Sequence, residues 1–70
     1  MKNISMEQRK KNYLADVYAE LSRRGISIDD VPRVIEKTGF MGALNDYPEE
    51  QMHYSISDAV DEILLVAASN

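Results

Sequence analysis

The sequence predicts an all-α fold, a small bundle of three main helices with one or two short helical turns before the last helix. Three observations predict this class. Apolar residues recur with helical rather than alternating spacing, glycines and prolines divide the chain into short segments, and 70 residues leave room for one domain. We therefore treat residues 1–70 as a single helical domain and expect residues 1–5 to be flexible.

The first predicted helix covers residues 6–24. Ser5 can cap it while Gln8, three residues later, reaches back, which is the pattern of a capping box. Gly25 can adopt the left-handed conformation that ends a helix. One apolar stripe runs along this segment: Leu14, Val17, Tyr18 and Leu21.

A second helix is predicted over residues 30–38, and its start depends on Pro32. Proline is tolerated only in the first turn, so Asp29 or Asp30 is the predicted cap, and Gly39 ends the helix.

Two short elements are predicted next. Residues 40–44 are apolar and bracketed by glycines, which favours a short helical turn in the core. Pro48 is followed by two acidic residues that suit the positive end of a helix, so a short helix is expected at about residues 48–53.

The last helix is predicted to begin at Ser55 or Ser57 and to run to about Ser69. Its residues 63–68 are apolar on every side, a pattern typical of a helix buried in its own domain or in an oligomer interface. A 70-residue domain has little material to surround such a helix, so we expect a homodimer, with burial in the chain's own core as the alternative. The expected interface residues are Ile63, Leu65 and Val66.

A partner-binding face is predicted around the short helix near residue 50. Methionine adapts to varied shapes and aromatic residues supply large contact areas. The candidate residues are Tyr47, Met52, His53 and Tyr54.

His53 also follows Glu49 and Glu50 with the Glu-x-x-His spacing of carboxylate-bridged metal bundles. Those bundles need two copies of the motif, so we expect a structural histidine and no metal, although a metal role for this trio stays open.

Composition restricts the function classes. The chain has 8 Lys+Arg, 12 Asp+Glu, one His and no Cys, with a net charge of −4. Thiolate zinc sites and cysteine nucleophiles are therefore excluded, and neither a phosphate-binding loop nor a nucleophile elbow is present. So small a domain can hardly enclose a substrate pocket. We predict a non-catalytic protein without a cofactor or a small-molecule substrate.

The charge is unevenly distributed, +3 over residues 1–24 and −7 over residues 25–70. A dipolar domain of this kind can steer a partner or associate head to tail. Two helices joined by a short turn also suggest the first half of a helix-turn-helix, so a DNA-binding or transcription-accessory protein is the alternative function. The net charge opposes phosphate binding and makes nucleic acid the less favoured partner. The basic residues that would serve it are Arg9, Lys10, Arg23, Arg24 and Arg33.

The order of features over residues 13–63 resembles a group of short bacterial proteins of unknown function, some of which lie beside toxin-like partners. The shared outline is an amphipathic helix, Gly25-Ile26-Ser27, Val31 and Ile35, Gly39, Tyr47, Met52-His53, and Asp58…Asp61-Glu62-Ile63. Met52 stands where such proteins more often have leucine. The resemblance implies an accessory or partner-binding protein and assigns no catalytic residue.

These observations together predict a small cytoplasmic protein-interaction module that binds another protein or itself. No apolar stretch of a signal peptide follows the N-terminus. The six-residue apolar run at residues 63–68 is far shorter than the roughly 18 residues of a membrane span, so no membrane partner is expected.

Overall fold

The structure, a computed structural model, describes residues 4–69, and over this range it contains helices and no strand. The helices are α1 (Met6–Arg23), α2 (Val31–Lys37), α3 (Phe40–Asp46), α4 (Pro48–His53) and α5 (Ile56–Ser69). The all-α class is therefore confirmed. The expectation of three main helices does not match: α1 and α5 are long, whereas α2 has 7 residues, the same length as α3.

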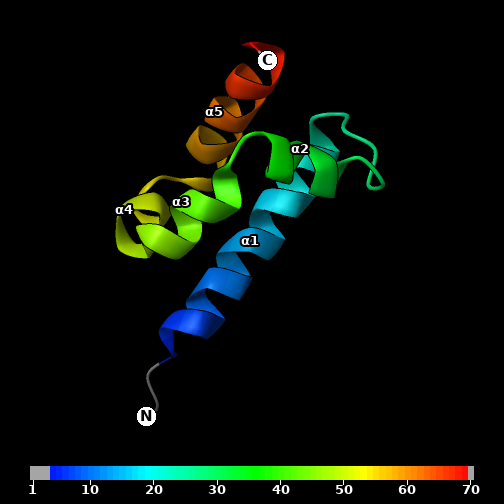
Figure 1. Ribbon diagram of the computed structural model, residues 1–70. Helices are drawn as coiled ribbons and strands as arrows, with labels where there is room; N and C mark the ends of the chain where they lie inside the picture. Colours follow the sequence, from blue (N-terminus) through cyan, green and yellow to red (C-terminus); the bar gives the residue numbers. More distant parts are fainter. Residues whose placement is uncertain (1–3, 70) are drawn as a thin grey trace.

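The two long helices determine the shape of the molecule. In Figure 1, α3 and α4 lie together on one side of α1, and α2 lies near the C-terminal end of α1. The first turns of α1 and the last turns of α5 project at opposite ends (Figure 1), and the principal extents are 41 × 21 × 18 Å. The most extensive contact between helices is that of α1 with α5.

Helix α1 begins and ends at local signals. The backbone amide of Gln8 donates to Ser5 Oγ at 3.1 Å, and Gly25 has φ +101° just beyond the C-cap. The reciprocal half of the predicted capping box is absent, because the side-chain amide of Gln8 donates to Asn12 Oδ1 at 2.9 Å instead. Residues four apart lie on the same helix face, so Asn12 competes for this amide.

Helix α2 agrees with the predicted range to within one residue at each end. Asp30 occupies the N-cap position, but its side chain makes no capping hydrogen bond and pairs with Arg33 at 3.2 Å. The carbonyl oxygen of Ser27 accepts from the amides of Asp30 and Val31 at 2.8 and 3.1 Å. A backbone turn therefore leads into α2 in place of the predicted aspartate cap.

The core lies where α1, α2, α3 and α5 meet. Helix α4 contributes no fully buried residue, and its Met52 is half-buried against the core. Helix α4 therefore packs at the edge of the core. The buried side chains are Val17, Leu21, Val31, Ile35, Phe40, Leu44, Ala59, Val60 and Ile63.

The predicted flexible segment, residues 1–5, is covered only in part, since residues 1–3 lie outside the described residues. Ser5, its last residue, serves as the N-cap of α1. Over the described residues, no helix combines the length and the apolar character needed to cross a membrane.

Candidate functional site: a groove between α4 and α5

An open groove of about 650 Å³ lies between α4 and α5. Two large apolar side chains line it and remain in solvent: Tyr54 is 57% exposed and Leu65 is 63% exposed. Both were predicted from the sequence, but for separate roles, and the structure brings them to one site. The residues lining this α4–α5 groove are Gln51, Tyr54, Asp58, Ala59, Asp61, Glu62 and Leu65.

Helix α5 supplies the acidic side of the groove. Four of its groove residues have the spacing i, i+3, i+4 and i+7, which places them on one helix face. Val60 and Ile63 of the same helix are buried in the core, so α5 divides into an acidic face and an apolar face. We call the four groove residues the α5 stripe: Asp58, Asp61, Glu62 and Leu65.

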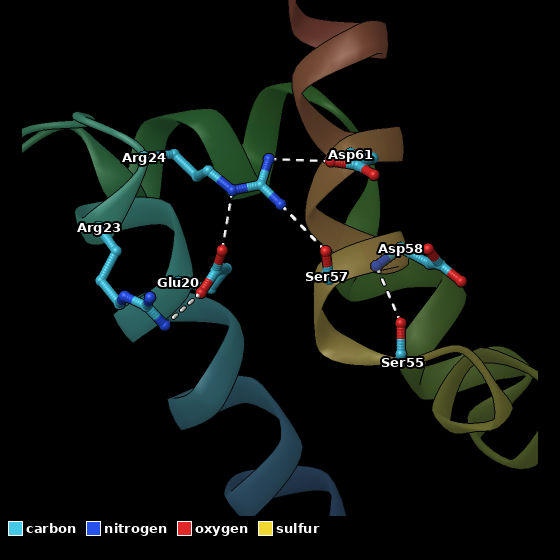
Figure 2. Close-up of polar contacts among 7 residues, drawn as sticks. All are labelled: Glu20, Arg23, Arg24, Ser55, Ser57, Asp58 and Asp61. Carbon is cyan, nitrogen blue, oxygen red and sulfur yellow. Dashed lines mark hydrogen bonds and ion pairs between the residues drawn. The ribbon is translucent and has the colours of Figure 1, made fainter.

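Ser55 fixes where the α5 stripe begins. Its Oγ accepts a hydrogen bond from the backbone amide of Asp58 at 3.1 Å (Figure 2), which is the geometry of an N-cap. Of the two predicted starting residues, Ser55 is therefore the one that caps α5, and Ser57 makes a different contact.

That contact is with Arg24, whose guanidinium bridges α1 and α5 (Figure 2). Its Nε donates to Glu20 Oε2 at 2.8 Å, its Nη1 to Asp61 Oδ1 at 2.9 Å, and its Nη2 to Ser57 Oγ at 3.2 Å. The hydrogen bonds to Asp61 and Glu20 raise the pKa of Arg24. This bridge holds the acidic face of α5 in place against the end of α1.

Asp58 and Glu62 differ from Asp61, because within residues 4–69 neither forms an ion pair. The α5 stripe therefore presents two uncompensated carboxylates beside the exposed Leu65.

Tyr13 attaches α4, the other wall of the groove, to α1. Its hydroxyl donates to the backbone oxygens of Gln51 and Tyr54, each at 3.0 Å. Its ring stacks on that of Phe40, with centroids 6.3 Å apart and an angle of 10° between the planes. Burial raises the pKa of Tyr13. Both groove walls are thus held against α1 by polar contacts that sequence analysis missed.

The four predicted partner-binding residues do not all line the α4–α5 groove. Tyr47 is 63% exposed at the start of α4, Met52 is turned toward the core, and only Tyr54 lines the α4–α5 groove. His53 is exposed in a shallow hollow of about 420 Å³ together with Tyr54, Glu49 and Glu50.

No group of three or more His, Asp or Glu side chains in residues 4–69 is arranged to hold a metal ion. The spacing of Glu49, Glu50 and His53 is therefore not completed by carboxylates from another helix of the described chain.

The three predicted dimer-interface residues lie in different environments. Ile63 is 3% exposed and belongs to the core of its own chain, so a second copy cannot reach its side chain. Leu65 is exposed in the α4–α5 groove, and Val66 is half-buried and lines a different hollow together with Thr38 and Ala43. Consecutive residues of a helix point in different directions, so this apolar run divides between core and surface.

Most of the basic residues considered for DNA binding form ion pairs with carboxylates of the same chain. Lys10 pairs with Glu7 at 3.3 Å, Arg23 with Glu20 at 3.1 Å, Arg33 with Asp30, and Arg24 with Glu20 and Asp61. A phosphate would have to displace these carboxylates, which does not favour the nucleic-acid interpretation.

The α4–α5 groove offers two apolar side chains for contact and two uncompensated carboxylates for ion pairing. This chemistry suits the binding of an apolar surface that carries positive charge. Comparison of the chain with protein-family models, with curated proteins and with solved structures found no match.

Proposed function

We propose that this chain is a small protein-interaction module, without catalytic activity, that binds a protein partner in the α4–α5 groove. The observation that carries the proposal is the pair Tyr54 and Leu65, both more than half exposed and both lining one groove with an acidic rim. Scattered exposed apolar residues are ordinary, but apolar side chains gathered in a polar-rimmed groove are typical of interaction sites.

The attachment of both walls to α1 supports the proposal. Tyr13 holds the end of α4, and Arg24 holds α5, so the groove exists before a partner arrives. A preorganised site loses less conformational entropy on binding than one that must be assembled.

The partner in this proposal is either another protein or a second copy of the chain. Of the predicted interface residues, Leu65 is the one that a second copy would contact in the groove, because Leu65 is exposed there whereas Val66 is half-buried and does not line it. DNA binding is not carried forward, since no observation in the structure favours it over the ion pairs already formed.

Site-specific photo-crosslinking tests the proposal. A photoreactive amino acid is placed at Leu65 in one variant and at Ile28 in another, because both side chains are 63% exposed and only Leu65 lies in the groove. After irradiation in the native host, we expect a discrete protein adduct from position 65 and none from position 28.

The mass of the adduct identifies the kind of partner, with twice the chain mass reporting a second copy. Adding Glu62→Lys to the Leu65 probe should lower the adduct yield, because a partner that carries positive charge loses an ion pair. Equal products from positions 65 and 28, or none from either, would contradict the proposed function.

A further inference from the structure

We infer that the occupant of the α4–α5 groove is a second copy of this chain, bound through an exposed stripe of its α1 helix. This inference rests on the proposed function and names its partner. The α1 stripe lines a shallow, largely apolar hollow of about 360 Å³ on the surface of α1. Its residues are Lys11, Leu14, Ala15 and Tyr18.

The α1 stripe is only partly covered within the chain. Val17 and Leu21 are the residues of α1 that are buried in the core, whereas Lys11 and Ala15 are exposed. Leu14 and Tyr18 are half-buried at the boundary between these two faces. The helix therefore presents a second, partly exposed apolar strip. Ala15, the smallest side chain of the strip, is available for close approach of another helix.

The two stripes match in length and in residue spacing. Each has residues at i, i+3, i+4 and i+7, so each extends for about 10 Å along its helix axis. The α1 stripe is charged only at its N-terminal residue, Lys11, whereas the α5 stripe is acidic at its first three positions. In both stripes the large apolar side chain is at the C-terminal end. Parallel packing of α1 from one copy on α5 of the other therefore places Lys11 near Asp58 and Glu62, and Tyr18 near Leu65.

The lysine of the α1 stripe and two carboxylates of the α5 stripe have opposite charges and are available for pairing. Within residues 4–69, Lys11, Asp58 and Glu62 form no ion pair. Neighbouring Lys10, by contrast, is paired with Glu7. A contact of Lys11 with the acidic rim thus gains ion pairs without breaking existing ones.

Charge repulsion also disfavours a dimer in which the α4–α5 groove of one copy faces the α4–α5 groove of the other. Such a twofold contact is self-complementary, so it would place the acidic α5 stripe of one copy against the acidic α5 stripe of the other. Like charges in an interface are unfavourable, whereas the α1 stripe brings a cation. The inferred contact is therefore head to tail, and it joins copies into a ring if the rotation closes or into a chain if it does not.

Sedimentation velocity over a concentration series tests the inference. We expect the average mass to rise with concentration, and to rise less in about 0.5 M salt, because exposed charges are screened. Lys11→Glu and Glu62→Lys should each weaken association about tenfold, the loss of one effective ion pair. The double variant should recover most of the wild-type affinity, because it restores opposite charges in reversed order.

Matched controls are available on α2. Lys37→Glu and Glu36→Lys change the net charge by the same amounts at exposed positions outside both stripes, and they should leave association unchanged. Circular dichroism of each variant verifies that its helical content is retained.

Four results would overturn the inference: a monomer at every concentration up to about 1 mM; equal weakening by the α2 controls; weakening by Glu62→Lys but not Lys11→Glu; or a helical double variant that fails to recover. A monomer that still gives a protein adduct at position 65 would refute the second copy as occupant and leave the proposed function standing. The proposed function itself fails if photo-crosslinking gives no adduct specific to position 65.

Discussion

Replacing Tyr13 with phenylalanine isolates the contact that holds α4 against α1. The substitution removes only the hydroxyl that donates to the backbone oxygens of Gln51 and Tyr54, each 3.0 Å away. The ring keeps its stacking on Phe40. The loss should therefore act on the end of α4, where Tyr54 forms one wall of the groove, with little effect on the core.

The magnitude follows from the number of hydrogen bonds and their exposure. One hydroxyl proton is shared between two carbonyl oxygens, and a typical intramolecular hydrogen bond contributes about 1 kcal/mol net. The contact with Tyr54 is exposed, so water can satisfy that oxygen once the hydroxyl is gone. We expect the free energy of unfolding to fall by about 0.5–1 kcal/mol, and the Tm to fall by about 4 °C.

Urea unfolding and amide hydrogen exchange measure this effect together. The amides of α4 should lose more protection than those of α1, because the lost bond attaches α4 only. Tyr18→Phe, which removes a hydroxyl elsewhere on the same helix, is the matched control. Unchanged stability with unchanged exchange in α4 would show that the Tyr13 hydroxyl does not position this helix.

Three further results are expected. Leu44→Ala should lower the free energy of unfolding, measured in urea, by about 3 kcal/mol, because Leu44 is fully buried and its truncation leaves a cavity. A loss below about 1 kcal/mol would contradict its place in the core. Ser55→Ala should lower the free energy of unfolding by about 1 kcal/mol in thermal melts, because Ser55 caps α5. Ser57→Ala should lower it by less, and the reverse order would refute Ser55 as the cap. Burial raises the pKa of Tyr13 above the ordinary value of 10.0, so the folded state holds this proton more tightly than the unfolded chain. Its stabilisation is complete below about pH 10 and is lost as the pH rises through the folded pKa, so unfolding measured from about pH 8 upward should show a smaller alkaline loss in Tyr13→Phe than in the wild type.

Local signals predicted the helix boundaries well. Ser5, Gly25 and Pro32 act through hydrogen bonds and backbone angles within a few residues, and α1 and α2 end within one residue of the predicted positions. Competition between neighbouring side chains was harder to foresee. The Gln8 amide could reach Ser5 or Asn12, and the Asp30 carboxylate could cap α2 or pair with Arg33; the second contact forms in each case.

The direction of side chains in an all-apolar stretch was not predictable from spacing. Residues 63–68 have no polar face to mark the solvent side, so the sequence predicts Ile63 and Leu65 in the same interface. In the structure, Ile63 is 3% exposed and Leu65 is 63% exposed. The packing of α5 against α1 and α2 determines which of these side chains is buried, and the apolar stretch itself contains no signal for it.

The sequence by itself determined the all-α class, most helix ends, and the separation of a basic first helix from an acidic remainder. The tertiary structure alone decided that Tyr54 and Leu65 share a groove and that Arg24 and Tyr13 hold its walls. The physical reason is the sequence separation over which each kind of contact acts. Helix signals operate over about four residues, whereas Arg24 and Asp61 are separated by 37 positions and Tyr13 and Tyr54 by 41. Such contacts exist only after the core has brought the helices together.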